Sequence, residues 1–358
     1  MNLIQNILNQ KTPFEQNSKF RSTDFLKEMK NLMEHHYKNS EEFRNIIINN
    51  EYVLTSNKLE ELPFIPTRLF KLLDLKSIPE SEIFKVMTSS GTSGQAVSKI
   101  FLDRSSASTQ TKVLTHIVTS FLGKKRKDML IIDSEETIKN SKKFSARTAG
   151  ILGFSTFGRN HTYALDKDLE LNLERVQHFI KKRSKDSVFI FGFTFMIWKN
   201  FFLKIRSENF NVCFPKNSIL LHGGGWKKLL AEQVDNELFK ESLKKIGINS
   251  VYDYYGMIEQ TGSIFLECNQ GYLHCSDYSE IIIRNAHTLE PQAFHQEGII
   301  QVLSLLPTSY PGNSLLTEDL GMILGEDDCK CGRKGKYFVM SGRMKESEIR
   351  GCSDTRVI

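Results

Sequence analysis

The sequence predicts an α/β protein, and three observations about its apolar segments support that fold class. Short apolar runs that lead into glycine or serine and then into a helical pattern occur at Met129–Ile132, Val188–Gly192 and Ser218–Gly223. Runs of this kind are typical of buried strands that each feed a loop and a helix. Helical periodicity precedes them, over residues 14–48, and strand-like runs dominate after residue 276.

These changes of pattern divide the chain into four predicted segments. Residues 1–80 are expected to form a helical segment packed on the core, and residues 81–275 an α/β core. Residues 276–340 should form a β-rich subdomain, and residues 341–358 a short tail. The predicted core side chains of the first segment are Phe20, Phe25, Leu26, Met29, Leu32 and Met33.

Composition and charge exclude several classes of protein. Of the 358 residues, 40% are hydrophobic and 25% are charged, as in an ordinary globular protein. The net charge of +6 lies in short basic runs without an element that could read bases, so we expect no nucleic-acid partner. We see no signal peptide and no apolar stretch of the ~18 residues that a membrane span needs. We therefore expect a cytoplasmic protein whose six cysteines are thiols or metal ligands rather than disulfides.

A loop rich in hydroxyl groups and glycine, TSSGTSG at residues 88–94, lies between two apolar segments. Small residues expose backbone N–H groups, and serine and threonine add hydroxyl donors, so such a loop can hold phosphate oxygens. It is not a Walker loop, because Gln95 rather than lysine follows Gly94. Taken alone, the stretch also fits a plain turn rich in serine and glycine.

Four further motifs follow this loop along the chain. The glycine run His222–Trp226 precedes the aromatic segment Val251–Thr261, which contains Tyr-Gly-Met-Ile-Glu. Thr317–Gly321 places acidic residues after an apolar segment, and Ser341–Glu346 adds cations near the C-terminus. In order and approximate spacing, these elements resemble the core motifs of the adenylate-forming superfamily, the acyl- and aryl-CoA synthetase type.

Two longer stretches resemble one family within that superfamily, the LuxE family of acyl-protein synthetases. They are Ser309–Gly321, SYPGNSLLTEDLG, and Ile349–Thr355, IRGCSDT. The resemblance, over residues 80–356, implies an adenylate-forming (ANL-like) large N-terminal domain in which residues 81–275 bind ATP and the acyl group. It also implies that residues 341–358 are a truncated hinge, with the usual C-terminal lid domain absent or vestigial, since 15 residues follow Arg343.

The resemblance assigns roles to individual residues. Glu259 would hold Mg²⁺ on the ATP phosphates, because a hard carboxylate suits a hard ion, and Asp319 would bind the ribose hydroxyls. On their own, Glu259 also fits an exposed helix carboxylate and Asp319 a turn cap. Arg343 and Lys345 are the expected catalytic cations. The remaining nucleotide contacts would come from Thr88, Ser89, Ser90, Gly91, Thr92, Ser93 and Gly94 around the pyrophosphate, and from Gly223, Gly224, Gly225, Tyr255 and Gly256 around the adenine.

A cysteine close to the C-terminus matches the acyl acceptor of the family. Cys352 lies between Gly351 and Ser353, which leave it sterically open, and Arg350 would favour its thiolate. The alternative is a surface thiol without a role. The acyl group itself would lie against Phe191 and Gly192, at the end of the strand predicted in the apolar run 188–198, and near His222, which abuts the glycine run. The run 188–198 also fits a plain core strand and the start of a helix.

Two short pairs of metal-ligand types, separated by a long insert, suggest a structural zinc site. Cys268 and His274 form the first pair, and Cys329 and Cys331 form the second. Cys275 is a rival ligand, and ordinary buried thiols are the alternative. Four protein ligands would leave no open position, so the metal would be structural rather than catalytic.

The sequence therefore predicts a ligase, an ATP-dependent acyl-protein synthetase with Mg²⁺ that activates a fatty or other carboxylic acid as acyl-AMP. The acyl group would pass to a protein cysteine and on to an acyl reductase partner (LuxC-like) or a carrier, as in bioluminescence-type fatty acid reductase. One alternative is an acyl- or aryl-CoA ligase. Another is a catalytically silent, adenylate-binding scaffold protein, which would bind nucleotide without exchanging pyrophosphate.

Overall fold

The computed structural model describes residues 2–54, 56–89, 96–139, 146–183, 186–208, 210, 212–226 and 233–344. These residues form two compact units. Unit 1 gathers the described residues of 1–89 and 94–120 and residues 256–344, and unit 2 contains those of 121–255. Among the described helices, none combines the length and apolar character that a membrane span requires.

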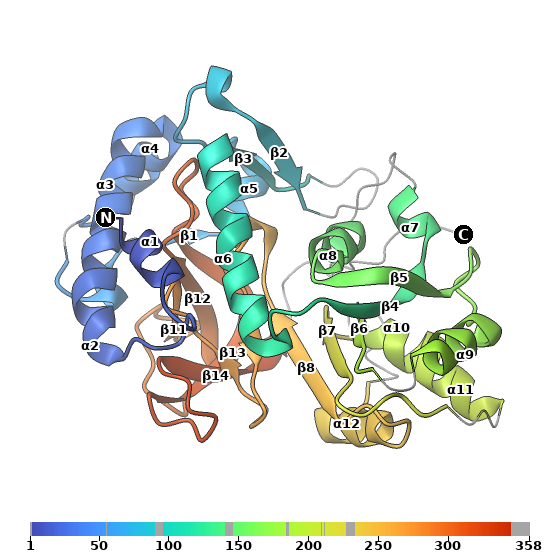
Figure 1. The fold of residues 1–358 in the computed structure, drawn as a ribbon. Coiled ribbons are helices and arrows are strands. Elements are labelled where there is room, and N and C mark those ends of the chain that lie inside the picture. Colours follow the sequence, from blue (N-terminus) through green and yellow to red (C-terminus); the bar gives the residue numbers. More distant parts are fainter. Residues whose placement is uncertain are drawn as a thin grey trace. The chain divides into compact units, whose positions relative to one another are not determined.

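Unit 1 is built on an antiparallel sheet with the order β11-β12-β13-β14-β10-β9 (Figure 1). β11 and β12 are wholly buried, and β1 adds a short parallel pairing to β13. A separate hairpin pairs β2 with β3. The strands are β1 (Ile65–Pro66), β2 (Lys85–Thr88), β3 (Lys99–Leu102), β9 (Phe265–Glu267), β10 (Leu273–His274), β11 (Ser279–Arg284), β12 (Gly298–Ser304), β13 (Ser314–Glu326) and β14 (Lys336–Arg343).

The helices of unit 1 confirm the predicted helical pattern of residues 14–48. All six predicted core side chains of this segment are buried. Ser40 ends α3 and caps α4, where its hydroxyl accepts the N–H of Phe43. The helical elements are α1 (Leu3–Leu8), α2 (Ser18–Phe20), a π-helical turn (Arg21–Phe25), α3 (Leu26–Asn39), α4 (Glu41–Asn49), α5 (Leu69–Leu72), α6 (Arg104–Leu122) and 3₁₀ turns at Leu59–Glu61, Glu80–Glu82 and Ile258–Gln260.

Unit 2 is a parallel sheet with helices between successive strands, in the order β8-β7-β6-β4-β5 (Figure 1). The strands are β4 (Lys127–Ser134), β5 (Gly158–Leu165), β6 (Phe189–Phe193), β7 (Ile219–Gly223) and β8 (Ser250–Tyr255). The helical elements are α7 (Glu136–Lys139), α8 (Ala146–Ser155), α9 (Leu173–Lys182), α10 (Thr194–Met196), a π-helical stretch (Ile197–Phe202), α11 (Leu203–Ser207) and α12 (Asn236–Lys244).

Each apolar run that predicted a strand is a strand in the structure. The runs at 129–132, 188–192 and 218–223 form β4, β6 and β7, except that Val188 and Ser218 directly precede β6 and β7. The strand-like segment after residue 276 contains β11 and β12. All five residues of β6 are buried, as expected for a strand covered on both faces. The α/β class is therefore confirmed, and it belongs to unit 2, whereas the segment after residue 276 is antiparallel β structure in unit 1.

Candidate functional site

The predicted phosphate loop joins the two strands of a hairpin in unit 1. Thr88 ends β2, and the loop returns at Lys99, the first residue of β3. Ser89 closes the hairpin from both sides, because its N–H donates to Ser98 O at 3.0 Å and its hydroxyl accepts the Ser98 N–H at 2.8 Å. Lys99 pairs with Asp74 at 3.1 Å on the surface. Ser90, Gly91, Thr92, Ser93 and Gly94 lie outside the described residues.

Three of the residues predicted to contact the acyl group or adenine are neighbours in unit 2. They are Gly192, His222 and Gly223, and they lie at the carboxyl ends of β6 and β7, where parallel sheets place ligands. Gly192 pairs with His222, and Phe193 pairs with Gly223. A Cβ on Gly223 would lie 2.5 Å from the ring of Tyr254. The absence of a side chain at this position therefore lets the aromatic ring lie against the end of β7.

His222 is a buried, neutral histidine at this strand end. Its Nδ1 lies 3.0 Å from Thr194 Oγ1, and the Thr194 hydroxyl is 3.2 Å from Gly223 O. If the hydroxyl donates to that carbonyl, Nδ1 carries the imidazole proton and Nε2 is an acceptor. Nε2 is buried and has no hydrogen-bond partner among the described residues. Burial, with a further contribution from Lys240, lowers the pKa of His222 to about 3.

The other predicted adenine contacts lie directly after β7, at the end of β8 and directly after β8. Gly224 and Gly225 have φ of 82° and 59°, a backbone region that favours glycine. Tyr255 is the last residue of β8 in unit 2. Gly256 begins the next segment of unit 1, where a Cβ would lie 2.9 Å from Ile264 Cγ2.

Glu259 is held in a buried 3₁₀ turn of unit 1. The residue is 5% exposed, so it is not the exposed helix carboxylate that the sequence also allowed. The backbone behind it is closely packed, because a Cβ on Gly312 would lie 2.7 Å from Glu259 O. Burial, together with the nearby charge of Glu259, raises the pKa of Tyr310. The turn therefore holds Glu259 at a buried position, beside Tyr310.

The predicted ribose-binding residue and the predicted terminal cation lie together in unit 1. Asp319 on β13 is the register partner of Arg343 on β14, and Arg343 Nε lies 3.4 Å from Asp319 Oδ1. The same guanidinium lies 3.3 Å from Glu318 Oε2. These side chains are only partly exposed, at 36% for Arg343 and 22% for Asp319. Lys345 and Cys352 lie outside the described residues.

The four predicted metal ligands of unit 1 converge. Their candidate ligand atoms all lie within 4.8 Å of one another. Cys268 Sγ is 4.0 Å from Cys329 Sγ, and Cys331 Sγ is 3.3 Å from His274 Nε2. A Zn–S bond of ~2.3 Å in a tetrahedral site implies ligand separations of about 3.8 Å, so this donor set fits zinc in size and in chemistry.

The backbone around these four residues is arranged to support ligand sulfur atoms. The N–H groups of Gln270 and Arg333 point at Cys268 Sγ and Cys331 Sγ, at 3.4 and 3.5 Å. Cys275, the rival ligand, is not part of this group. It is fully buried, and burial, followed by the charge of Glu280, raises the pKa of its thiol well above the usual value.

Sequence reasoning missed a buried ion pair at the end of β4 in unit 2. Arg147 Nε lies 2.9 Å from Asp133 Oδ2, and the Thr137 hydroxyl donates to Asp133 Oδ1 at 2.6 Å. Burial raises the pKa of Asp133, and Arg147 opposes that shift. In the sequence, the sign of this ion pair is that Asp133 directly follows the apolar run Met129–Ile132. A cavity of about 1020 Å³ lies along β5 and α9, and none of the predicted site residues lines it.

Solved structures show which known fold this chain shares. Over 95% of this chain and 79% of that chain, the fold matches 2-hydroxyisobutyryl-CoA ligase crystallised with 2-HIB-AMP and CoA, with a TM-score of 0.69 and 16% identity. The postadenylation state of that ligase with R3-HIB-AMP gives a TM-score of 0.68, with 93% and 69% of the chains covered. The fold is thus that of an adenylate-forming ligase.

The family follows from the sequence as a whole. A family model described as "Acyl-protein synthetase, LuxE" matches residues 2–357, and the chain belongs to this family. Two relatives are named long-chain-fatty-acid–luciferin-component ligase. The relative from Aliivibrio fischeri is 24% identical over 80% of this chain and 76% of its own length, and that from Vibrio harveyi is 22% identical over 91% and 85%.

Proposed function

We propose that this protein activates a long-chain fatty acid with ATP and transfers the acyl group to a protein thiol. The observation that carries the proposal is the LuxE family match over residues 2–357, because it covers nearly the whole chain. The names of the two relatives support a long-chain fatty acid as the substrate.

The first step makes a poor electrophile reactive. A carboxylate oxygen of the acid attacks the α-phosphorus of ATP, and an O–P bond forms as the bond to the bridging oxygen breaks. Pyrophosphate leaves, and the product is acyl-AMP. The protein's task here is to position the reactants and stabilise charge.

Residues of unit 1 would serve the nucleotide. Asp319 would accept hydrogen bonds from the ribose hydroxyls, and Arg343, which already lies beside it, would orient that carboxylate or contact a phosphate. Thr88 and Ser89 would add donors at the phosphate loop. Glu259 would hold Mg²⁺, which neutralises phosphate charge when bound.

Residues of unit 2 would serve the acid. Phe191 and Gly192 are buried residues of β6, and Gly192 pairs with His222, so they would form part of the apolar wall behind the acyl chain. His222 stays neutral because its burial lowers its pKa to about 3. A neutral imidazole near an acyl chain costs little desolvation, whereas a charged one would be unfavourable.

The second step needs a nucleophile, for which we propose Cys352. Its thiolate would attack the acyl carbon, a C–S bond would form as the C–O bond to the phosphate breaks, and AMP would leave. The thioester would then be passed to an acyl reductase partner. We also propose that Cys268, His274, Cys329 and Cys331 bind a structural Zn²⁺, supported by their separations.

The test is carboxylate-dependent ATP–pyrophosphate exchange with acids from short to long chains and with aryl acids. Intact-protein mass spectrometry of the wild type, Cys352→Ser and the matched control Cys213→Ser would follow the acyl group. We expect exchange with long-chain acids, and an acyl mass increment that is absent only in Cys352→Ser. Exchange with acyl transfer to CoA instead would support a CoA ligase, and nucleotide binding without exchange would leave only the scaffold.

A further inference from the structure

We propose that the metal site fastens the N-terminal part of unit 1, so that loss of the ion releases it. We call residues 12–25 the N-terminal strap, and residues 327–335, which contain Cys329 and Cys331, the knuckle loop. The inference rests on the zinc site proposed above. It adds a task for the ion, which is to hold the knuckle loop in the form that binds the strap.

The strap contacts the knuckle loop directly. The Lys334 N–H donates to Phe14 O at 3.1 Å, and the Ser18 N–H donates to Asp327 Oδ2 at 2.9 Å. Asp327 also accepts the N–H of Gly335 at 2.8 Å, which joins the two ends of the loop. The protection of two backbone N–H groups, that of Ser18 in the strap and that of Lys334 in the knuckle loop, therefore shows whether the strap is bound to the loop.

One strap side chain reaches the metal ligands themselves. The ring of Phe14 lies edge-on to the imidazole of His274, with 6.3 Å between centroids. The guanidinium of Arg333 lies 5.4 Å from the same ring, and the Arg333 N–H points at Cys331 Sγ. Phe14 thus packs on one ligand and on the residue that supports another.

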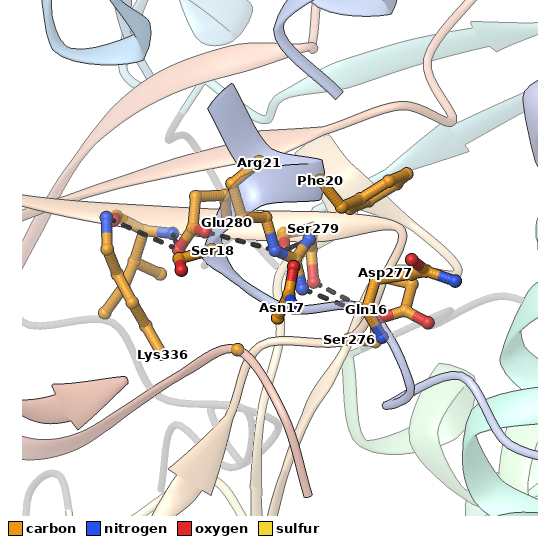
Figure 2. A network of polar contacts seen from close by, with 12 residues as sticks. Gln16, Asn17, Ser18, Phe20, Arg21, Ser276, Asp277, Ser279, Glu280 and Lys336 are labelled. Atoms are coloured by element: carbon orange, nitrogen blue, oxygen red, sulfur yellow. Dashed lines mark hydrogen bonds and ion pairs between the residues drawn. The ribbon is translucent and has the colours of Figure 1, made fainter. Parts of the chain in front are cut away.

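A second anchor holds the strap to β11 and the turn before it (Figure 2). Asp277 accepts the N–H groups of Glu15 and Gln16, each at 3.2 Å, and its own N–H donates to Pro13 O at 2.7 Å. Arg21 lies 3.6 Å from Asp277 and 3.4 Å from Glu280, and it donates to the Ser279 carbonyl. This anchor does not include a metal ligand.

The knuckle loop is held by hydrogen bonds but has no hydrophobic core. Its sequence, DDCKCGRKG, has no apolar side chain besides the two cysteines. Gly332 and Gly335 have φ of 84° and 83°, which costs glycine little but leaves the unfolded loop very free. Metal binding contributes folding free energy where a site orders such a loop. Without the ion, the knuckle loop would no longer hold the Lys334 N–H and the Asp327 carboxylate in place to bind Phe14 and Ser18.

The experiment compares the full-length protein with bound Zn²⁺ and after treatment with a zinc chelator. Metal content is measured by mass spectrometry, and amide hydrogen exchange is followed in residues 12–25 and 327–335. We expect zinc in a 1:1 ratio, and exchange at Ser18 and Lys334 at least tenfold faster after its removal. The amides of β12, in the same unit, serve as the unchanged reference. Cys331→Ser should reproduce the effect, and Cys213→Ser, an exposed thiol elsewhere, should not.

The outcomes separate the two proposals. A protein that holds and then loses zinc while the strap amides exchange as before would overturn this inference and leave the zinc site standing. A protein that takes up no zinc would overturn both. Because coupling is reciprocal, Phe14→Ala should also weaken Zn²⁺ affinity, by about tenfold, without changing a ligand. Unchanged affinity in that variant would also count against the coupling.

Discussion

The pH dependence of stability should carry a clear contribution from one buried histidine. His36 on α3 is fully buried, and its two ring nitrogens lie 2.8 Å from the Ser77 hydroxyl and 3.1 Å from the Pro307 carbonyl. Because a carbonyl only accepts, Nε2 carries the proton and Nδ1 accepts from Ser77. Burial, with a smaller contribution from His35, lowers the pKa of His36 to about 3.

The sign and size of the effect follow from this pKa. Between pH 6.5 and 3 the unfolded chain binds a proton at His36, and the folded protein does not. The free energy of unfolding therefore falls as the pH falls, by about 1.4 kcal/mol per pH unit below 6.5. Between pH 7.5 and 5.0 the loss from this histidine amounts to about 2 kcal/mol.

Urea unfolding of the wild type and of His36→Gln at pH 7.5, 6.5, 5.5 and 5.0 measures this contribution. Glutamine can still donate to the Pro307 carbonyl, and any constant cost cancels when the pH slopes are compared. His222, whose pKa is also lowered to about 3, contributes its own slope to both proteins. We expect the variant to lose about 2 kcal/mol less than the wild type, and His178→Gln, on an exposed histidine, to match the wild type. Equal slopes for the wild type and His36→Gln would refute the reasoning.

Three further changes test other parts of the molecule. Glu259→Gln should lower pyrophosphate exchange at least 100-fold, because it removes the proposed magnesium ligand, and exchange within tenfold of wild type would exclude that role. Gly223→Ala should cost about 1–3 kcal/mol by crowding the facing tyrosine ring, whereas Gly153→Ala, with open space around it, should leave the urea midpoint equal or higher. Arg21→Met should destabilise unit 1 by about 3–5 kcal/mol, since it leaves buried carboxylates uncompensated, and Arg159→Met, on the surface, by no more than about 1 kcal/mol in the same urea assay.

The sequence predicted best what short-range pattern determines. The strands β4, β6 and β7 are buried on both faces, so their apolar runs could be recognised as strands from the sequence, without knowing which strands lie beside them. The zinc candidates Cys268, His274, Cys329 and Cys331 were also predictable, because each pair is local and thiols beside histidine are unusual.

Long-range charge pairing was not predictable from the sequence. Arg21 is a charged residue in a polar helical segment, which normally indicates a solvated face. The structure buries it against Asp277 and Glu280, more than 250 positions away. His36 likewise fits a surface helix position by pattern, and only the carbonyl of Pro307 and the hydroxyl of Ser77 make its burial favourable.

The docking of the strap also sets an order of events during synthesis. Ser18 and its acceptor Asp327 are 309 residues apart. At ~5–20 residues per second on the ribosome, the strap waits about 15 to 60 s for its partner. During that interval the Ser18 N–H and the Phe14 carbonyl lack the partners that they have in the folded protein. The described residues of unit 2 lie in one stretch of the chain, 121–255, which is synthesised before the last strands of unit 1.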